Sequence, residues 1–370
     1  MVVCCWVWKR GALSPQEVKH SVFDLRDFQN SFPPKCWSPR YAGGGIYRHT
    51  RLVKTPRLHF ARHGVVVDAS SPATIVSGAP RAVVHASAEL IDDEEPDDAS
   101  VGAAPNTVRF TLVGPDGVVV ARKVGAVSPM DLVANVSFEV LSASRWSVRT
   151  PSLYTMQAEM LVGSELSVLD ASNVTFGMRS IEWSPRRGLL LDDTHVKIRG
   201  FCNHNNFAGV GMAVPDRVNL ARLQTLRGLG GNGWRMSHNP PDPALLDMMD
   251  RLGVLALDEN RWFNPSPDEQ VYLDGFTEMV KRDRHHASVI AFSVCNEGGC
   301  DHGAVQGPRF RAAMNRADRT RAMTGNMIQD MGQGLVPSLD VAGFSHLSGD
   351  TFDSFHSTHP NTPQAADGML

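Results

Sequence analysis

The 370-residue sequence lacks several features that mark whole classes of protein. No apolar run approaches the roughly 18 to 20 residues that a membrane-spanning helix needs. No block of Lys and Arg is present, and the formal net charge is only −3. We therefore expect neither a membrane nor nucleic acid as the main partner. The first residues, MVVCCWVWKR, have an apolar run without a basic segment before it, so we do not interpret them as a signal peptide.

Cysteine is scarce and shows no recognisable spacing. The six cysteines have neither CxxC spacing nor the density of a disulfide scaffold, so we expect mostly reduced thiols. No pair of histidines has the HExxH-like spacing of a zinc-binding helix. The sequence alone therefore predicts no metal ligands. The histidines considered for that role are expected to be structural or to contact substrate: His204, His238, His285 and His286.

With 42% apolar and 20% charged residues, the chain is long enough for two or three domains with cores of their own. Between about residues 59 and 184, short stretches alternate apolar and polar side chains, and GPDG at residues 114–117 predicts a hairpin turn. We predict a β-sandwich of immunoglobulin size here. The acidic run at residues 92–98 is expected to be a solvated loop, with a calcium site as the alternative.

From about residue 185 onward, strand and helix patterns alternate. Apolar residues recur at helical spacing around Phe276 and Phe310, which indicates helices that cover a sheet. Repeated βα units predict a (β/α)8 TIM barrel, here with about six strands. The predicted strands are residues 196–201, 233–237, 254–258, 288–294, 323–328 and 340–345.

One pattern matches a binding motif without its context. GLGGNG at residues 228–233 has the GxGxxG spacing of a dinucleotide site. It follows a helical pattern and precedes a strand, which is the reverse of the arrangement that such a site needs. We therefore expect no dinucleotide there.

The fourth predicted barrel strand ends in an amide and a carboxylate. The nearly continuous apolar run at residues 288–294 is typical of a buried parallel strand, and Asn296 and Glu297 follow it. In a parallel α/β barrel the carboxyl ends of the strands carry the chemistry. Glu297 is thus a candidate catalytic residue, and the alternative is a helix start or a solvated loop end.

Six short motifs occur in an order that resembles glycoside hydrolase family 2, the β-galactosidase, β-glucuronidase and β-mannosidase group. The resemblance covers essentially the whole chain, and although each motif is weak alone, six in order are specific. The motifs are YAGGGIYR at 41–48, FGMR at 176–179, VKIRG at 196–200, NGWRMSHN at 232–239, LGVLALDE at 252–259 and SVCNE at 293–297.

The resemblance implies a domain plan and a partner. Residues 1–58 would be the C-terminal remnant of a jelly-roll sugar-binding domain, 59–184 an immunoglobulin-like sandwich, and 185–370 an incomplete TIM barrel without strands seven and eight. The partner would be a β-linked oligosaccharide or glycoside. The chemistry would need no cofactor, although some relatives use Mg²⁺ near the active site. The oligomeric state and the compartment stay open.

The resemblance also assigns roles to individual residues. Glu297 would be the general acid/base, because a glycosidic oxygen leaves poorly unless it is protonated. Asn296 would hydrogen-bond the sugar 2-hydroxyl. A substrate-pocket role is implied for the remaining candidates, and for Arg235 a structural salt bridge is a compatible alternative. These candidates are His204, Arg235, His238, Glu259 and His346.

Two departures from the family affect these assignments. Where the family often reads Arg-Asn-His-Pro-Ser before strand four, this chain has RHHAS at residues 284–288, and Ser345-His346 replaces the usual Asn-Tyr after strand six. A well-characterised β-galactosidase specificity is therefore not assumed.

A retaining mechanism also requires a second carboxylate about 5 to 5.5 Å from the acid/base. The family places that glutamate at the end of strand seven, but no glutamate follows Glu297 in this sequence. Asp350 and Asp353 are expected in a helix, and Asp367 in a frayed tail. We therefore expect no nucleophile in this chain.

Two hypotheses follow. The first is a retaining exo-β-glycosidase whose nucleophile is lost by truncation, so that residues 1–370 alone are inactive. The second is a non-catalytic carbohydrate-binding or scaffold protein derived from the same family.

Overall fold

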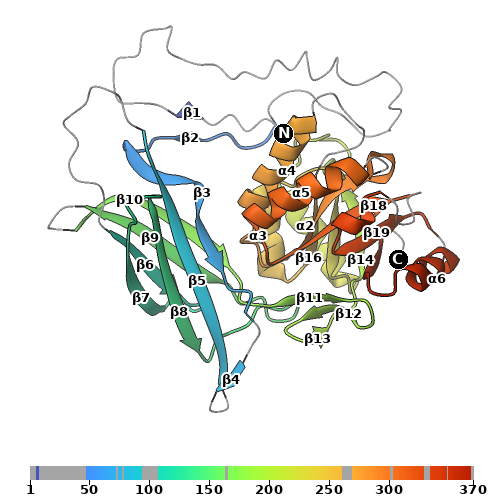
Figure 1. Ribbon diagram of the computed structural model, residues 1–370, viewed down its shortest axis with the longest axis horizontal. Coiled ribbons are helices and arrows are strands. Elements are labelled where there is room, and N and C mark those ends of the chain that lie inside the picture. Colours follow the sequence, from blue (N-terminus) through green and yellow to red (C-terminus); the bar gives the residue numbers. More distant parts are fainter. Residues whose placement is uncertain are drawn as a thin grey trace, which may run out of the picture.

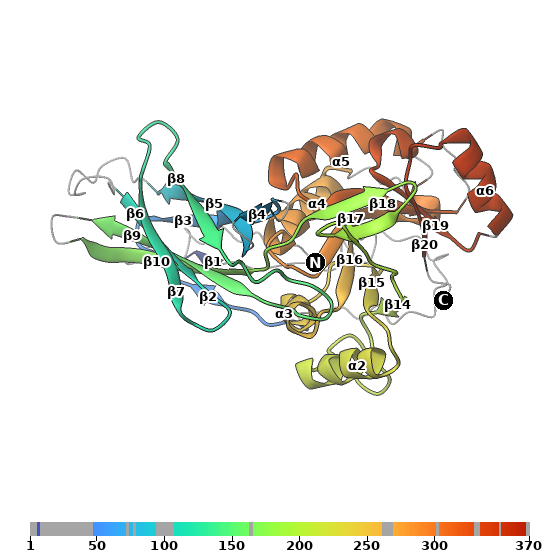
Figure 2. The same ribbon diagram turned by 90° about the horizontal axis from the view of Figure 1, so that it is seen from below.

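The computed structural model describes residues 6–7, 47–71, 74–76, 79–93, 107–162, 166–260, 269–300, 303–328, 334–347 and 349–367. These residues form an antiparallel β-sandwich and a curled parallel sheet with helices around it, which lie side by side (Figure 1). Helix α6 (Gly349–Thr358) lies at the end of the molecule farthest from the sandwich (Figure 2). The predicted fold class, a sandwich followed by a barrel-type sheet, is confirmed.

The sandwich consists of two antiparallel sheets. One has the strand order β10-β9-β6-β7, and in the other β5 pairs with β3, β4 and β8. Alternate residues of each central strand point inward, so that Tyr154, Met156 and Ala158 of β9 are buried in the shared core. The strands are β3 (Leu58–Asp68), β4 (Thr74–Val76), β5 (Ala79–Asp92), β6 (Thr107–Val113), β7 (Val119–Ala126), β8 (Val133–Leu141), β9 (Tyr154–Val162) and β10 (Ser167–Phe176).

The predicted hairpin turn connects β6 to β7. The Gly117 N–H donates to the Gly114 carbonyl oxygen at 3.0 Å. Gly117 has φ 79°, a left-handed conformation that glycine adopts without steric cost. Of the acidic run, Asp92 forms an ion pair with Arg57 at 2.6 Å, and the predicted loop at residues 94–98 lies outside the described residues.

A small three-stranded sheet links the two parts. It contains β11 (Ile181–Ser184), β12 (Gly188–Leu191) and β13 (Thr194–His195), paired in that order. Leu189 and Leu191 of β12 pack with Leu255 and Ile290 of the parallel sheet. The linking sheet therefore covers one end of the parallel sheet.

Seven parallel strands form the second part in strict sequence order. All eight residues of β17 are buried, which matches its nearly continuous apolar sequence. The strands are β14 (Gly200–His204), β15 (Gly233–Ser237), β16 (Leu255–Glu259), β17 (Val289–Asn296), β18 (Ala322–Met327), β19 (Val341–Ser345) and β20 (Gln364–Asp367).

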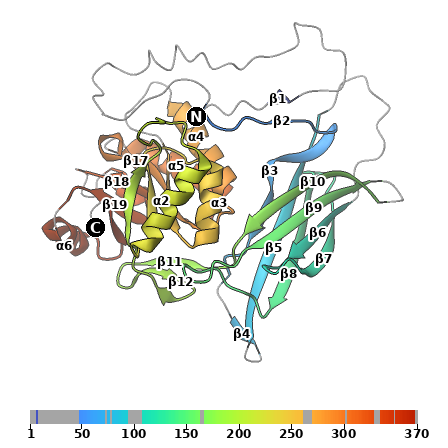
Figure 3. The same cartoon turned by 180° about the vertical axis from the view of Figure 1, so that it is seen from behind.

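The helices cover the outside of this sheet, and Figure 3 shows α2 and α3 side by side there. Helix α3 has regular ends, since the Asp242 carboxylate accepts from the Ala244 N–H at 3.1 Å and Gly253 ends the helix at φ 66°. Phe276 and Phe310 are buried against each other between α4 and α5, as their spacing predicts. The helices are α2 (Asp216–Gly228), α3 (Pro243–Leu252), α4 (Glu269–Asp283), α5 (Gly303–Ala317) and α6, with short 3-10 helices η1 (Glu297–Cys300) and η2 (Val336–Ser338).

The first barrel strand begins later than predicted. Residues 196–201 alternate like a strand, but β14 runs from Gly200 to His204. Val196 and Ile198 instead pack against the buried cluster that contains Leu189, Leu255 and Ile290. At Gly200 a Cβ atom would lie only 2.0 Å from the Gly233 carbonyl oxygen, so glycine is required where β14 meets β15.

The expectation that the seventh strand is missing is wrong. β20 (Gln364–Asp367) pairs in parallel with β19, and Asp367 lies opposite Ser345. Asp367 is therefore the last residue of a strand and not part of a frayed tail. The strand was missed because its sequence, QAAD, has no β-branched or aromatic residue.

Buried contacts join the sandwich to the barrel part. The Arg179 guanidinium donates to the carbonyl oxygen of Val289 at 2.6 Å and also to that of Ala287. Its environment excludes water, and this burial lowers the pKa of Arg179 well below its ordinary value. The indole N–H of Trp146 donates to the Asp250 carbonyl oxygen at 2.9 Å.

The RHHAS segment at residues 284–288 also joins the barrel part to the sandwich. Arg284 donates to the His63 carbonyl oxygen at 2.5 Å, and His285 accepts from the Val67 N–H at 3.2 Å. Burial lowers the pKa of His285 well below its ordinary value, which keeps this ring neutral. The departure from the family at residues 284–288 therefore lies at the contact between the sandwich and the barrel part and not at the candidate active site.

The predicted jelly-roll remnant lies largely outside the described residues. Within it, β1 (Trp6–Val7) pairs in parallel with β2 (Leu52–Val53). Arg48, the last residue of the first family motif, donates to the carbonyl oxygens of Pro240 and Pro241 at 2.9 and 3.0 Å. Burial lowers the pKa of Arg48. Among the described helices, none has the length and apolar character needed to cross a membrane.

Candidate active site

The predicted site residues gather at the carboxyl ends of neighbouring strands of the parallel sheet. This placement follows from the topology, because parallel strands in sequence order bring their carboxyl ends to one rim. His204, Glu259 and Asn296 each end a strand, Arg235 lies within β15, and His238, Glu297 and His346 follow the ends of β15, β17 and β19.

A buried charge network joins three of these strands. The Arg235 Nε donates to Glu259 Oε2 at 2.7 Å, and one terminal nitrogen of Arg235 donates to the Asn296 side-chain oxygen at 2.6 Å. The Glu259 side chain is fully buried and that of Arg235 is 7% exposed. Two charges removed from water in this way depend on each other, and Arg235 in turn fixes the orientation of the Asn296 amide.

Two histidines border this network. His238 Nδ1 lies 2.6 Å from Glu259 Oε1, so the carboxylate fixes the orientation of the His238 ring. The rings of His204 and His238 meet edge to face, with centroids 5.4 Å apart. The structure thus brings His204, His238 and Glu259 together as one group.

Asn326 on β18 was missed by the sequence analysis. Its side-chain amide donates to Glu259 Oε2 at 3.0 Å and to the Ser293 hydroxyl at 3.1 Å. The only signal for it in the sequence is an amide side chain near the end of the predicted strand at residues 323–328. Glu259 thus accepts hydrogen bonds from Arg235 in β15, from His238 just after β15, and from Asn326 in β18.

Glu297 lies at the open side of this group. It starts η1 directly after β17, has φ 50°, and its side chain is 34% exposed. His346 also has a left-handed backbone, at φ 59°, and its Nε2 lies 3.3 Å from Glu297 Oε1. Such conformations are uncommon for residues other than glycine and are enriched at functional sites. The sharp turn places a partly exposed carboxyl group beside the buried network.

A disulfide brackets Asn296 and Glu297. Cys295 and Cys300 are bonded, both are fully buried, and their Cα atoms are 5.4 Å apart. The prediction of reduced thiols is therefore wrong for these two residues, because η1 folds the chain back over five positions and brings the two side chains together. Cys202 is free, and the remaining cysteines lie outside the described residues.

Asp258 faces away from the site, since neighbouring residues of a strand point to opposite faces. Burial raises the pKa of Asp258 well above 3.8, and the neighbouring Asp283 carboxylate raises it further. Arg282 holds the Asp283 carboxylate with contacts of 2.6 and 2.5 Å. Asp258 therefore belongs to the layer between sheet and helices, while Glu259 faces the network.

The described residues contain no group of three or more His, Cys, Asp and Glu side chains that could hold a metal ion. Glu259 already accepts three side-chain hydrogen bonds. The arrangement instead offers one partly exposed carboxyl group, Glu297, beside a rigid set of hydrogen-bond donors and acceptors. That combination suits proton transfer to a bound polar substrate.

Comparisons with known proteins agree with this geometry. The family model described as "Glycosyl hydrolases family 2, TIM barrel domain" matches residues 186–332, and the model "Glycosyl hydrolases family 2" matches residues 84–179. A solved structure of a glycosyl hydrolase family 2 member from Bacteroides cellulosilyticus superimposes with a TM-score of 0.74 at 27% identity. That match covers 88% of this chain and 42% of the solved one.

Two curated relatives carry enzyme names. A β-galactosidase, BoGH2A of Bacteroides ovatus, is 30% identical over 274 residues, which is 70% of this chain and 30% of the relative. A β-glucuronidase of Streptococcus agalactiae is 29% identical over 172 residues, covering 41% of this chain and 28% of the relative. The chain thus spans less than a third of the length of these relatives.

Proposed function

Because this chain belongs to glycoside hydrolase family 2, we propose that it carries the acid/base half of a retaining exo-β-glycosidase site. The substrate class is a terminal β-linked sugar, with β-galactosidase-like chemistry. The observation that carries the proposal is Glu297, a partly exposed carboxyl group at the carboxyl end of the fourth strand, next to an asparagine that Arg235 holds in place.

In this proposal Glu297 begins the reaction protonated. It donates its proton to the glycosidic oxygen as the bond from that oxygen to the anomeric carbon breaks, while a second carboxylate bonds to the anomeric carbon. Glu297 then takes a proton from water as the water displaces the carboxylate. Both proton transfers use the same carboxyl group, so its position beside the leaving oxygen decides the rate.

The buried network would fix the side chains that position the sugar. Arg235 orients the Asn296 amide, to which we assign the hydrogen bond to the sugar 2-hydroxyl, and Glu259 orients the His238 ring. We assign Glu259 a positioning role, because its oxygens are already engaged by Arg235, His238 and Asn326. His204 and His346 border the same space and are proposed to contact the sugar or the aglycone.

The nucleophile is the incomplete part of the proposal. After Glu297 every acidic residue in the sequence is an aspartate. Asp350 and Asp353 lie on α6, and Asp367 ends β20. An aspartate is one methylene shorter than the glutamate of the family, and catalytic groups tolerate only about 0.5 Å of misplacement. We therefore propose that residues 1–370 by themselves form no glycosyl-enzyme intermediate.

Two carboxyl groups suffice for acetal hydrolysis, so we propose that the chemistry requires no metal or organic cofactor. Mg²⁺ can still support the site in the way it does in some family members. Dialysis of the full-length enzyme against a chelator is expected to leave at least part of its activity. Complete loss that Mg²⁺ alone reverses would contradict this part of the proposal.

The acid/base assignment is tested with Glu297→Ala in the full-length enzyme. Substrates with poor leaving groups, such as lactose, need the proton and should slow by about 10²-fold or more. An activated aryl β-galactoside should slow far less, and added azide should restore its turnover because a small anion needs no general base.

Asp353→Ala, on the exposed side of α6, is the control and should leave both substrates unaffected. Equal losses on both substrates without azide rescue would assign the proton donor elsewhere.

A further inference from the structure

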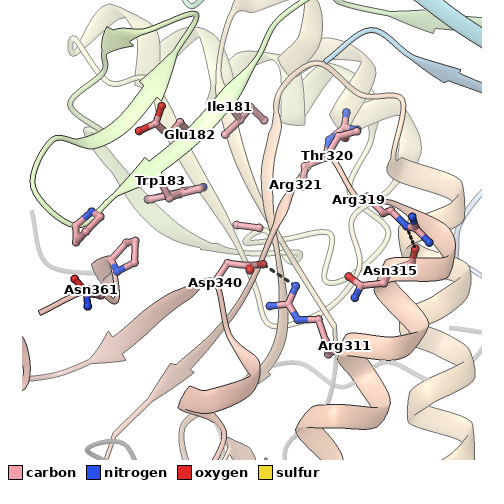
Figure 4. A pocket seen from close by; sticks show the side chains of 13 residues that line it. Ile181, Glu182, Trp183, Arg311, Asn315, Arg319, Thr320, Arg321, Asp340 and Asn361 are labelled. Atoms are coloured by element: carbon pink, nitrogen blue, oxygen red, sulfur yellow. Dashed lines mark hydrogen bonds and ion pairs between the residues drawn. The ribbon is translucent and has the colours of Figure 1, made fainter. Parts of the chain in front are cut away.

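A groove opens at the end of the parallel sheet opposite to Glu297. It has a volume of about 720 Å³ and lies between the linking sheet and α5, where residues just before or at the start of β18, β19 and β20 form its floor. Figure 4 shows Glu182 and Trp183 on one wall and Asn315 and Arg319 on the other. A second hollow of about 660 Å³ shares Arg311, Asn315 and Asp340 with it. The two hollows therefore lie next to each other along α5.

One wall of the groove carries an anchored indole. Trp183 lies on β11, is partly buried, and packs on Ala291, Ala322 and Val341 of the sheet. Its indole N–H points inward and donates to the Ile290 carbonyl oxygen at 3.3 Å. The ring is thus held in one orientation and offers a rigid apolar surface to the groove.

Most of the positive charge in the groove is already neutralised. Arg311 pairs with Asp340 at 2.7 Å and also donates to the Ser338 carbonyl oxygen. Arg321 pairs with Asp318 at 3.1 Å and donates to backbone carbonyl oxygens. An anionic ligand would compete with these carboxylates for the same guanidinium groups, so we expect an anion to bind weakly in the groove.

The other polar side chains that line the groove have a net charge of zero. The side chains of Glu182, Asn315 and Asn361 make no hydrogen bond within the described part of the chain. Among the described residues, Arg319 donates only through its Nε, to the Asn315 carbonyl oxygen at 2.9 Å. One carboxylate, one guanidinium and two amides thus present donors and acceptors around Trp183.

This set matches the chemistry of a neutral sugar. Sugar hydroxyls both donate and accept, as carboxylate, amide and guanidinium partners require, and the C–H face of a pyranose ring packs on an indole. Each of the two hollows lies in the size range of ligand sites, roughly 300 to 1,000 Å³. We propose that this groove binds a neutral oligosaccharide at a site separate from the candidate active site.

The experiment measures binding by isothermal titration calorimetry in a Glu297→Gln background, which prevents hydrolysis. The probes are cellotetraose and β-1,4-galactotetraose, and inorganic phosphate tests for an anion site. Either saccharide should bind with Kd below about 10 mM. Glu182→Ala and Arg319→Ala should each weaken binding about 5-fold or more, since each removes a partner of the ligand hydroxyls.

Arg316→Ala is the matched control, because Arg316 is an exposed arginine near the end of α5 that does not line the groove. Its affinity should equal that of the parent. Trp183→Phe keeps a ring in the hydrophobic contact and should also weaken binding, while circular dichroism checks that the linking sheet is intact.

Three results would overturn the proposal. The first is no heat from either saccharide at about 10 mM. The second is phosphate binding that Arg319→Ala abolishes, which would make the groove an anion site. The third is saccharide binding that His238→Ala abolishes and Arg319→Ala leaves unchanged, which would place the sugar at the active site. Because hydrolysis is absent from the experiment, failure here leaves the proposed function of Glu297 untouched.

Discussion

Two ion pairs, one at each end of the parallel sheet, differ in their exposure to water. At the carboxyl end, Arg235 and Glu259 are buried and bonded to further side chains. At the amino end, Arg311 and Asp340 pair in the lining of an open groove with side chains 23% and 46% exposed. A buried pair depends on its geometry, whereas an exposed pair is screened by water. The comparison indicates that the Arg235–Glu259 pair contributes more to stability than the Arg311–Asp340 pair does.

The largest difference between the two ends is expected on removing one arginine from each. Arg235→Ala leaves the Glu259 carboxylate buried without its ion-pair partner and should lower the free energy of unfolding by about 3 to 5 kcal/mol. Arg311→Ala, the matched variant, should cost at most about 1 kcal/mol. Urea titrations of both variants measure this difference. Equal losses would show that the two ends do not differ in the way described.

The disulfide beside Glu297 is expected to have the next largest effect. Removing the bond with Cys295→Ser or Cys300→Ser should lower the free energy of unfolding by about 2 kcal/mol, because the closed loop between the two residues is short. Cys202→Ser, at the free cysteine, is the control. Alkylation of the unfolded, unreduced protein followed by mass spectrometry should leave Cys295 and Cys300 unmodified. Alkylation of both would contradict the bond.

Removing the Asn326 side chain from the carboxyl-end network is expected to have a smaller effect on stability. Asn326→Ala removes one of the donors to Glu259 while Arg235 and His238 keep theirs, so a loss of about 1 kcal/mol is expected. Asn315→Ala at the amino-end groove should cost nothing measurable, since its side chain makes no hydrogen bond within the described residues. Thermal melts of both variants compare them. An unchanged melting temperature for Asn326→Ala would remove Asn326 from the network.

The smallest effect concerns pH and the layer behind the site. Burial raises the pKa of Asp258 above its unfolded value of 3.8, so the folded state binds the proton more tightly. Stability from this group is present below pH 3.8 and falls as the pH rises toward the folded pKa. Asp258→Asn, which stays neutral, should therefore gain stability relative to wild type as the pH rises from 4 to 8.

A gain of about 2 °C or more in melting temperature at the upper end of that range is expected. Asp353→Asn on α6 serves as the control. A gain for Asp258→Asn that shrinks with rising pH would contradict the stated direction.

The sequence predicted the parts of this structure that depend on local pattern. The apolar run before Asn296 gave β17 nearly to its ends, and the motifs placed Arg235, Glu259 and Glu297 at one rim. It also predicted the turn at Gly114 and the buried faces of α4 and α5. These features follow from the spacing of side chains along one element.

Features that depend on contacts between elements were missed. β20 has weak strand propensity and forms because β19 offers it backbone hydrogen bonds. The Cys295–Cys300 bond requires the turn of η1, which no cysteine spacing signals. Asn326 joins the network through a partner 67 positions away. Tertiary contacts decided β20 and the role of Asn326, and the disulfide depended on the backbone path of a short turn that side-chain pattern does not predict.

The central proposal is that Glu297 is the proton donor of a retaining glycosidase and that residues 1–370 supply no nucleophile for it. The most direct test incubates this chain with a 2-fluoro β-galactoside bearing an activated leaving group, which traps glycosyl-enzyme intermediates, and weighs the intact protein by mass spectrometry. We predict no covalent adduct, even though Glu297 and its supporting network are in place. A stoichiometric adduct would contradict the claim, and its position on Asp367 or another carboxylate would identify the nucleophile.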